Sequence, residues 1–157
     1  MYRRILVALD GSELAERILP HVEALSEKFG AAVTLLRATT PPETLLAATA
    51  QGGTVVEPPI DPTPVVEAEE EDAENYLRAV ADRLRRDGVT IDAEHSEGDP
   101  AQTILSRARE LPADLIAMTT HGRGGLGRVV FGSVADEVLR HASCPVLLVR
   151  IPEDEAQ

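Results

Sequence analysis

Short, uninterrupted apolar runs that alternate with segments of helical periodicity constrain the fold of this chain more than any other feature. The first run, residues 5–9, ends at Asp10-Gly11-Ser12. Unbroken apolar runs of this length are typical of parallel strands that are buried on both faces. Apolar residues then recur at helical spacing as far as Gly30, which predicts a helix capped by Ser12 and ended by a glycine. A second apolar run follows, so the order strand, helix, strand predicts a right-handed crossover in a parallel sheet.

The same alternation continues along the chain and predicts a single domain over residues 1–152, followed by an acidic tail at 153–157. Four more strands are expected, at residues 31–38, 89–96, 114–120 and 144–151. The third strand of the chain alternates polar and apolar residues, which favours an edge position with one face in water. Five strands that alternate with four helices predict an open, mostly parallel, three-layer α/β fold.

Local signals mark where these helices begin, end or bend. Pro20 falls inside the first helical pattern, where it predicts a kink. Asp99-Pro100 is expected to open a later helix, with proline in the first helical position. Ser133 is expected to cap the last helix.

The segment 40–68 interrupts the alternation and contains six of the chain's 11 prolines. We expect a proline-rich loop here, with one short helix near residues 45–50. A loop of this length is typical of a lid, an interaction segment or a flexible connection, and the sequence leaves these alternatives open. The acidic run at 67–72 is expected to begin the next helix, because negative charge suits the positive end of a helix.

The formal net charge of −12 restricts the partners of this chain. Nucleic acids and anionic membranes would be repelled at long range, and an aromatic content of 3% leaves little material for stacking on bases. The single cysteine, Cys144, fits a reducing compartment, and no apolar run is long enough for a transmembrane helix. The N-terminus turns acidic too early for a signal peptide. We therefore expect a cytoplasmic protein that binds neither nucleic acid nor membranes.

The segment 121–134, HGRGGLGRVVFGSV, contains five of the chain's 11 glycines and two arginines but no acidic residue. Its GRGGLG matches the G-x-G-x-x-G of dinucleotide-binding folds literally. That fingerprint belongs after the first strand and opens directly into a helix, whereas this one follows the fourth expected strand and stops short of the helix. A P-loop requires a lysine between its last glycine and the hydroxyl residue, and here Gly132 is followed directly by Ser133. The position in the chain therefore disfavours a dinucleotide fingerprint, and the missing lysine excludes a P-loop.

Two other interpretations of this segment remain open. As an anion loop, its glycines would let the backbone approach a ligand, and Gly132-Ser133 would lie at the mouth of the last helix, where free N–H groups and the helix dipole favour negative charge. Arg123 and Arg128 would add positive charge that suits phosphate. The alternative is a mobile loop with an ordinary serine cap.

The other half of a nucleotide site is expected at the end of the first strand. In open α/β sheets, ligands bind beyond the carboxyl ends of the strands where the strand order reverses, which would involve the first and fourth strands. Asp10 ends the first strand, and Thr119-Thr120-His121 end the fourth. Asp10 could accept hydrogen bonds from a ribose or a base, or could cap the first helix with Ser12. We assign no catalytic residue, because no general base is evident, and no metal ligands, because histidines and cysteine do not cluster.

Two stretches resemble a known family: ILVALDGSELAERIL at residues 5–19 and DLIAMTTHGRGGLGRVVFGSVADEVLRHASCPVLLVR at 114–150. Through them the chain resembles the universal stress protein family over nearly its full length. The resemblance implies a three-layer, open, parallel five-stranded sheet of order 3-2-1-4-5 with helices on both faces, of the adenine nucleotide alpha hydrolase-like type. It also implies a homodimer joined through the last strand. That strand is apolar enough for a free edge to favour association, unless its own helices cover it.

One branch of that family binds ATP through G-x-x-G, nine residues and then G-S or G-T. In this chain the first glycine is replaced by Thr119, whose side chain could crowd the ribose or offer it a hydroxyl. The resemblance implies that Asp10 meets the ribose and base, that two alanines line the adenine pocket, and that backbone N–H groups surround the phosphates. The implied binding residues for ATP with Mg²⁺, or for another adenine nucleotide, are Ala8, Asp10, Ala38, Met118, Thr119, Gly122, Arg123, Gly132, Ser133 and Val134.

The function that these observations favour is a stress-response nucleotide-binding protein that acts as a dimeric regulator. ATP is expected to order the glycine-rich loop and so to change the surface that partners meet. Two alternatives remain: an interaction protein that binds no nucleotide, and a slow ATPase or nucleotidyl transferase built on the same sheet.

Overall fold

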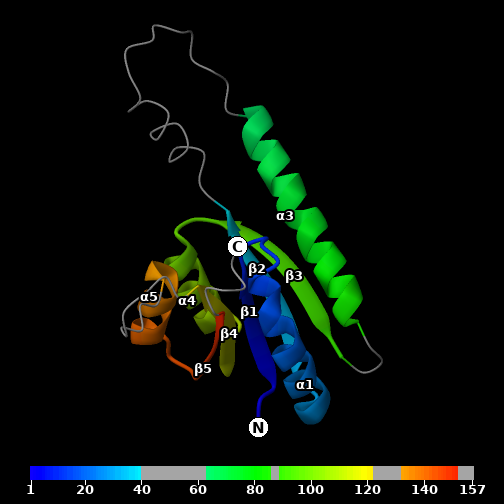
Figure 1. Ribbon diagram of the computed structural model, residues 1–157, viewed down its shortest axis with the longest axis vertical. Coiled ribbons are helices and arrows are strands. Elements are labelled where there is room, and N and C mark those ends of the chain that lie inside the picture. The colour runs from blue at the N-terminus through cyan, green and yellow to red at the C-terminus, as the bar shows by residue number, and fades with distance from the viewer. Residues whose placement is uncertain (40–62, 86–88, 122–131, 152–157) are drawn as a thin grey trace, which may run out of the picture.

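A single parallel sheet of five strands forms the centre of the protein (Figure 1). The computed structural model describes residues 1–39, 63–85, 89–121 and 132–151. The strand order is β3-β2-β1-β4-β5, and every neighbouring pair is parallel, which confirms the predicted fold class. The strands are β1 (Arg4–Leu9), β2 (Ala32–Thr39), β3 (Ile91–Glu97), β4 (Leu115–His121) and β5 (Val146–Ile151).

The strand order reverses beside β1, which lies between β2 and β4. Ile5 is in register with Val33 of β2 on one side and with Leu115 of β4 on the other. The chain runs outward from β1 through β2 to the edge strand β3, then returns to β4 on the opposite side. This is the switch point at which a crevice opens beyond the carboxyl ends of β1 and β4.

Helices cover both faces of the sheet (Figure 1). The helices α1 (Leu19–Phe29) and α3 (Thr63–Leu84) cover one face together with a short 3₁₀ helix, η1 (Ala15–Ile18), whereas α4 (Pro100–Glu110) and α5 (Ser133–His141) cover the other. Alternate residues of β1 supply the two cores: Ile5 and Val7 face the first group of helices, and Leu6 faces the second. All three are at most 1% exposed, as expected for a strand buried on both faces.

The first helical segment differs from its prediction at Pro20. The chain forms η1 first, and α1 begins at Leu19, so Pro20 lies in the first turn of α1 and kinks nothing. Proline is tolerated there because its missing N–H has no partner in the first turn in any case. Gly30 ends α1 in the left-handed conformation, with φ of 64°, as its position in the sequence predicted.

The third helix begins earlier than expected. We predicted a loop to about residue 68, but α3 already begins at Thr63, with Pro64 in its first turn. The remainder of the proline-rich segment, including the short helix predicted near 45–50, lies outside the described residues, as does the acidic tail. None of the helices in the described part of the chain is long and apolar enough to cross a membrane.

The N-cap of α4 is the predicted residue, whereas the N-cap of α5 is not. Asp99 caps α4 as predicted, because its Oδ1 accepts a hydrogen bond from the Gln102 N–H at 3.0 Å, with Pro100 in the first position. Ser133 does not cap α5. The N-cap is Gly132, Ser133 is the first helical residue, and no side chain makes a capping hydrogen bond there.

Candidate functional site

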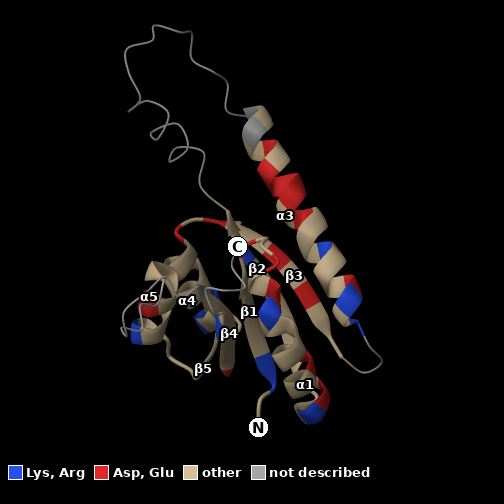
Figure 2. Cartoon of the chain, viewed as in Figure 1, with Lys and Arg blue, Asp and Glu red and all other residues tan. Residues whose placement is uncertain are grey.

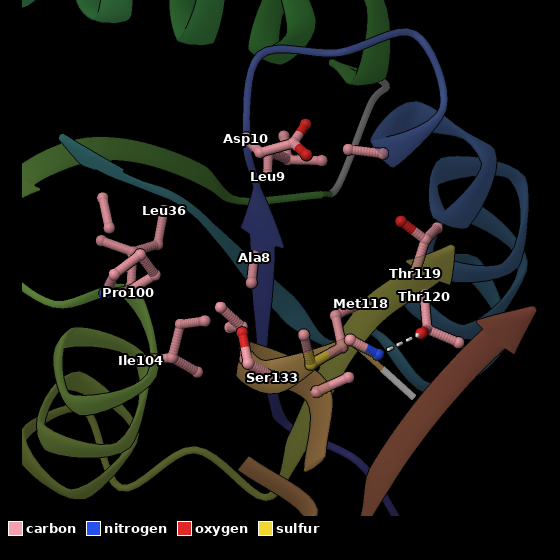
Figure 3. A pocket seen from close by; sticks show the side chains of 15 residues that line it. Ala8, Leu9, Asp10, Leu36, Pro100, Ile104, Met118, Thr119, Thr120 and Ser133 are labelled. Atoms are coloured by element: carbon pink, nitrogen blue, oxygen red, sulfur yellow. Dashed lines mark hydrogen bonds between the residues drawn. The ribbon is translucent and has the colours of Figure 1, made fainter. Parts of the chain in front are cut away.

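A cavity of about 270 Å³ lies at the carboxyl ends of β1 and β4, against the first turn of α5 (Figure 3). This volume is near the lower end of the range of about 300–1,000 Å³ that is usual for small-molecule sites. Its position coincides with the switch point in the strand order. Its described lining residues are Ala8, Leu9, Asp10, Ala15, Leu36, Ala38, Pro100, Ile104, Met118, Thr119, Thr120, Gly132, Ser133, Val134 and Ala135.

The turn after β1 places Asp10 at the rim of this cavity (Figure 3). The Ser12 N–H donates a hydrogen bond to Asp10 Oδ1 at 2.8 Å, and Ser12 Oγ accepts one from the Ala15 N–H at 3.1 Å. Gly11 between them has φ of 86°, which a residue with a side chain adopts only at a cost. Asp10 and Ser12 therefore support the start of η1, and the exposed Asp10 keeps its second carboxylate oxygen for other partners.

The first turn of α5 supplies backbone donors to the cavity. The first helical hydrogen bond of α5 runs from the Asp136 N–H to the Gly132 carbonyl oxygen at 2.9 Å. The N–H groups of Ser133, Val134 and Ala135 precede it and have no acceptor within the helix. All three residues line the cavity, and the helix dipole adds a partial positive charge at this end. The arrangement is suited to an anion such as phosphate.

Thr120 fixes the position of this helix mouth. The residue is 3% exposed, and its Oγ1 accepts a hydrogen bond from the Gly132 N–H at 3.3 Å (Figure 3). The end of β4 is thereby joined to the N-cap of α5. Thr120 was expected at the end of the fourth strand but was not among the predicted site residues. Side chains two positions apart on a strand lie on the same face, so the predicted site residue Met118 was the signal that could have identified Thr120.

Thr119 lies beside the cavity, but its side chain points to the opposite face of the sheet from Thr120. Side chains alternate along a strand, and Figure 3 shows the Thr119 side chain directed away from Ser133. The threonine that replaces the family's first glycine therefore leaves the mouth of α5 uncovered. Its two expected effects, crowding the ribose or offering it a hydroxyl, concern the ribose and stay predictions.

Small and apolar side chains form the rest of the wall. Ala8 of β1 and Ala38 of β2 each contribute only a methyl group to the cavity wall. Ile104 and Pro100 of α4 close the side opposite Met118 (Figure 3). A flat, largely apolar group such as a nucleobase could occupy this side, while its polar substituents meet the strand ends and the helix mouth.

Every predicted site residue in the described part of the chain lines this one cavity. Gly122 and Arg123 lie outside the described residues, and so does the side chain of His121. Several lining residues were not predicted. They come from β1, η1, β2, α4 and α5 and are Leu9, Ala15, Leu36, Pro100, Ile104 and Ala135, together with Thr120 of β4. Most of them are apolar residues that sequence patterns mark only as core.

Asp10 is the one ionisable side chain among the described residues that line the cavity. A carboxylate alone can hold hydroxyl groups or a cation, but it has no nearby histidine or lysine among these residues to share a proton with. The described residues hold no group of three or more metal-ligating side chains. A Mg²⁺ ion commonly binds through one or two carboxylates together with substrate phosphates, so this donor set fits a cation that arrives with a nucleotide.

The chain is similar to proteins of one family. The model of the Universal stress protein family matches residues 1–150. Universal stress protein MJ0531 of Methanocaldococcus jannaschii is 31% identical over 99% of this chain and 86% of its own length. The universal stress protein of Thermus aquaticus encoded in the QAH/OAS sulfhydrylase 3′ region is 34% identical over 96% of this chain and 100% of its own length.

Solved structures extend the comparison to the fold. UspA from Lactobacillus plantarum has a TM-score of 0.72 at 25% identity and covers 95% of this chain and 98% of its own. A universal stress protein in complex with cAMP has a TM-score of 0.66 at 21% identity over 96% of this chain and 98% of its own. A family protein from Arabidopsis thaliana with AMP bound has a TM-score of 0.64 at 18% identity over 99% of this chain and 95% of its own. The chain belongs to the universal stress protein family.

Proposed function

We propose that this stress-response protein binds ATP together with Mg²⁺ in the cavity between β1, β4 and α5, and that it acts in the cytoplasm as a dimeric regulator. The observation that carries the proposal is the first turn of α5, where the N–H groups of Ser133 and Val134 face the cavity without acceptors inside the helix. The neighbours that hold cAMP and AMP support an adenine nucleotide as the ligand class.

The cavity offers each part of a nucleotide a different surface. The phosphates would lie at Ser133 and Val134, with Gly122 and Arg123 contributing from the segment outside the described residues. Asp10 would accept hydrogen bonds from the ribose hydroxyls. Ala8 and Ala38 would border the adenine, and Met118 and Thr119 would border the sugar. Mg²⁺ would neutralise phosphate charge, which matters in a chain with a net charge of −12.

The binding experiment is calorimetric titration of ATP with and without Mg²⁺. The variant Ala38→Leu fills the adenine side of the cavity and is expected to weaken ATP binding at least tenfold. The control Ala93→Leu adds the same atoms at an exposed position on β3, away from this cavity, and should bind as the unmodified chain does. No detectable binding of ATP, AMP or cAMP at millimolar concentration would overturn the nucleotide proposal and leave the interaction protein as the explanation.

The dimer would use the free edge of β5. This strand pairs only with β4 among the described strands, and Val146, Leu147, Leu148 and Val149 are each only partly buried in the single chain. An apolar edge strand that is open on one side favours pairing with another chain. Sedimentation analysis should give a dimer for the unmodified chain. Leu147→Lys and Val149→Lys together should give a folded monomer, and an unmodified chain that sediments as a monomer would contradict the proposal.

A further inference from the structure

Arg37 lies beside the turn that follows β1, on the sheet face covered by α1 and α3. It pairs in register with Leu9, the last residue of β1. Its Nη1 donates a hydrogen bond to Asp72 Oδ2 of α3 at 2.9 Å. Its Cζ lies 5.5 Å from the centroid of the Tyr76 ring, also on α3, which is within the range of a cation–π contact. The side chain is only 18% exposed, so it is packed between these elements.

The guanidinium also packs against Gly11. A Cβ atom added at Gly11 would lie 2.9 Å from Arg37 Cζ and 3.2 Å from each terminal nitrogen. The planar group therefore occupies the space that a side chain at residue 11 would need, and the φ of 86° also favours glycine at this position. The guanidinium is thus held between the turn on one side and α3 on the other.

We propose that Arg37 is a positioning residue for the nucleotide site: by pressing on Gly11 from an anchor on α3, it holds the turn in the conformation that presents Asp10 to the ligand. The effect on ligand binding rests on the proposed function, whereas the contacts of Arg37 with Gly11, Asp72 and Tyr76 exist in the free protein. Arg37 does not line the cavity and would act only through the turn.

The surroundings of Arg37 explain why an arginine stands here. Asp72 and Tyr76 face it from α3, and Asp10 and Glu16 bring negative charge from the turn and from η1 close enough to affect Tyr76. A planar guanidinium can stack on a ring and on a backbone while it pairs with a carboxylate, which the compact ammonium group of lysine cannot do. Figure 2 shows how strongly acidic the first half of α3 is. The positive charge of Arg37 therefore lies between this acidic helix and the carboxylates of Asp10 and Glu16.

A second contact between α3 and this region offers a comparison. Arg83 Nη2 donates to Glu16 Oε2 at 2.6 Å and so joins α3 to η1 beyond the turn. That contact anchors the helix but touches neither Asp10 nor Gly11. Arg37, by contrast, joins α3 to the turn itself through Asp72 and Gly11.

The first experiment measures the free protein. The Ser12 amide donates to Asp10 Oδ1, so its hydrogen-exchange rate reports the population of the closed turn. Arg37→Gln is expected to speed that exchange about tenfold. Arg37→Lys keeps the charge but should exchange almost as fast as Arg37→Gln, because an ammonium group cannot pack flat against Gly11. The control Arg85→Gln removes the same charge from an exposed ion pair with Asp82 on α3 and should leave the Ser12 amide unchanged. Equal Ser12 exchange rates in Arg37→Gln and the unmodified chain would overturn the inference.

The second experiment measures ligand discrimination, which a simple loss of charge does not alter. ATP and 2′,3′-dideoxy-ATP carry the same phosphates, so the ratio of their Kd values isolates the ribose hydroxyls. The unmodified chain should prefer ATP about tenfold or more, as hydrogen bonds to a charged group allow. In Arg37→Gln this preference should fall to about twofold or less, whereas Arg85→Gln should keep it.

The outcomes separate the two proposals. If the unmodified chain binds no ATP, the proposed function fails, and the exchange rate of Ser12 still decides whether Arg37 holds the turn. If ATP binds and Arg37→Gln weakens ATP and dideoxy-ATP by the same factor, Arg37 acts through charge alone and the inference fails. Far-ultraviolet circular dichroism of each variant establishes that it is folded before either measurement.

Discussion

The backbone N–H of Gly132 donates a hydrogen bond to Thr120 Oγ1 across 3.3 Å, and this contact joins the end of β4 to the start of α5. It places the N-cap of α5 beside the carboxyl ends of β1 and β4, where the cavity lies. The remaining first-turn N–H groups of the helix thereby face the cavity, while the one at Gly132 is already occupied.

Thr120→Val keeps the shape of the side chain and removes the acceptor. We expect a loss of about 1 kcal/mol in the free energy of unfolding, because one hydrogen bond is lost and the Gly132 N–H loses its partner. ATP affinity should fall several-fold, because the helix mouth is less firmly held. Urea unfolding and calorimetric titration measure the two effects.

The neighbouring Thr119→Val is the matched control for that variant, because it makes the same change on the opposite face of β4. Its free energy of unfolding should remain close to that of the unmodified chain, because the hydrogen bond from Gly132 is accepted by Thr120. Equal losses of stability in the two variants would contradict the role assigned to Thr120.

Two glycines at helix ends should respond differently to alanine. Gly30 has φ of 64°, so Gly30→Ala should destabilise by about 1 kcal/mol although nothing lies within 4 Å of the added Cβ. Gly132 is the N-cap of α5, with φ of −58° and equally open space, so Gly132→Ala adds no left-handed strain and should cost only about 0.5 kcal/mol, because glycine is the better N-cap. Thermal unfolding of both variants tests this, and a larger loss at Gly132 would contradict the described backbone.

The ion pair between Arg107 and Glu94 should hold α4 against the edge strand β3. Arg107 Nη2 donates to Glu94 Oε2 at 2.7 Å, and Nη1 donates to Glu110 Oε2 at 2.9 Å. Both Glu94 and Arg107 have side chains about one third exposed, so Glu94→Gln should cost no more than about 1 kcal/mol. Urea unfolding at low and high salt measures it. The cost should shrink in high salt, and a cost that salt leaves unchanged would contradict an electrostatic origin.

Stability should fall at alkaline pH because of Tyr76. Burial, and after it the nearby carboxylates of Glu16 and Asp10, raise the pKa of Tyr76 above its ordinary value of 10.0, while Arg37 acts in the opposite direction. The unfolded chain then ionises at a lower pH than the folded one, so this contribution is complete below pH 10 and is lost as the pH rises above it. Tyr76→Phe should flatten the decline, which urea unfolding above pH 10 can measure.

A direct measurement accompanies that prediction. The chain has two tyrosines, so Tyr2→Phe leaves Tyr76 as the one phenol. Its ultraviolet titration in the folded protein should show phenolate forming only well above pH 10. A midpoint at the ordinary value would show that the Tyr76 hydroxyl is not buried.

Much of the architecture could be predicted from local patterns. The unbroken run of β1 indicated a buried parallel strand, and the alternating pattern of β3 indicated an edge strand, as the sheet order confirms. The ends of the helices were less predictable. Pro20 looked like a kink because a 3₁₀ turn and an α-helix carry similar apolar spacing, and Ser133 looked like a cap because the sequence does not reveal which residue leaves helical geometry first.

The sequence by itself determined a parallel α/β sheet with polar and glycine-rich residues at the ends of β1 and β4, because apolar periodicity fixes which segments are strands and which are helices. Only the tertiary structure decided that Thr120 and not Thr119 meets Gly132, and that Arg37 reaches from Gly11 to Asp72. Those contacts join residues 12 to 35 positions apart, so they depend on strand register and on which helix packs over which face. Local sequence patterns carry no information on either.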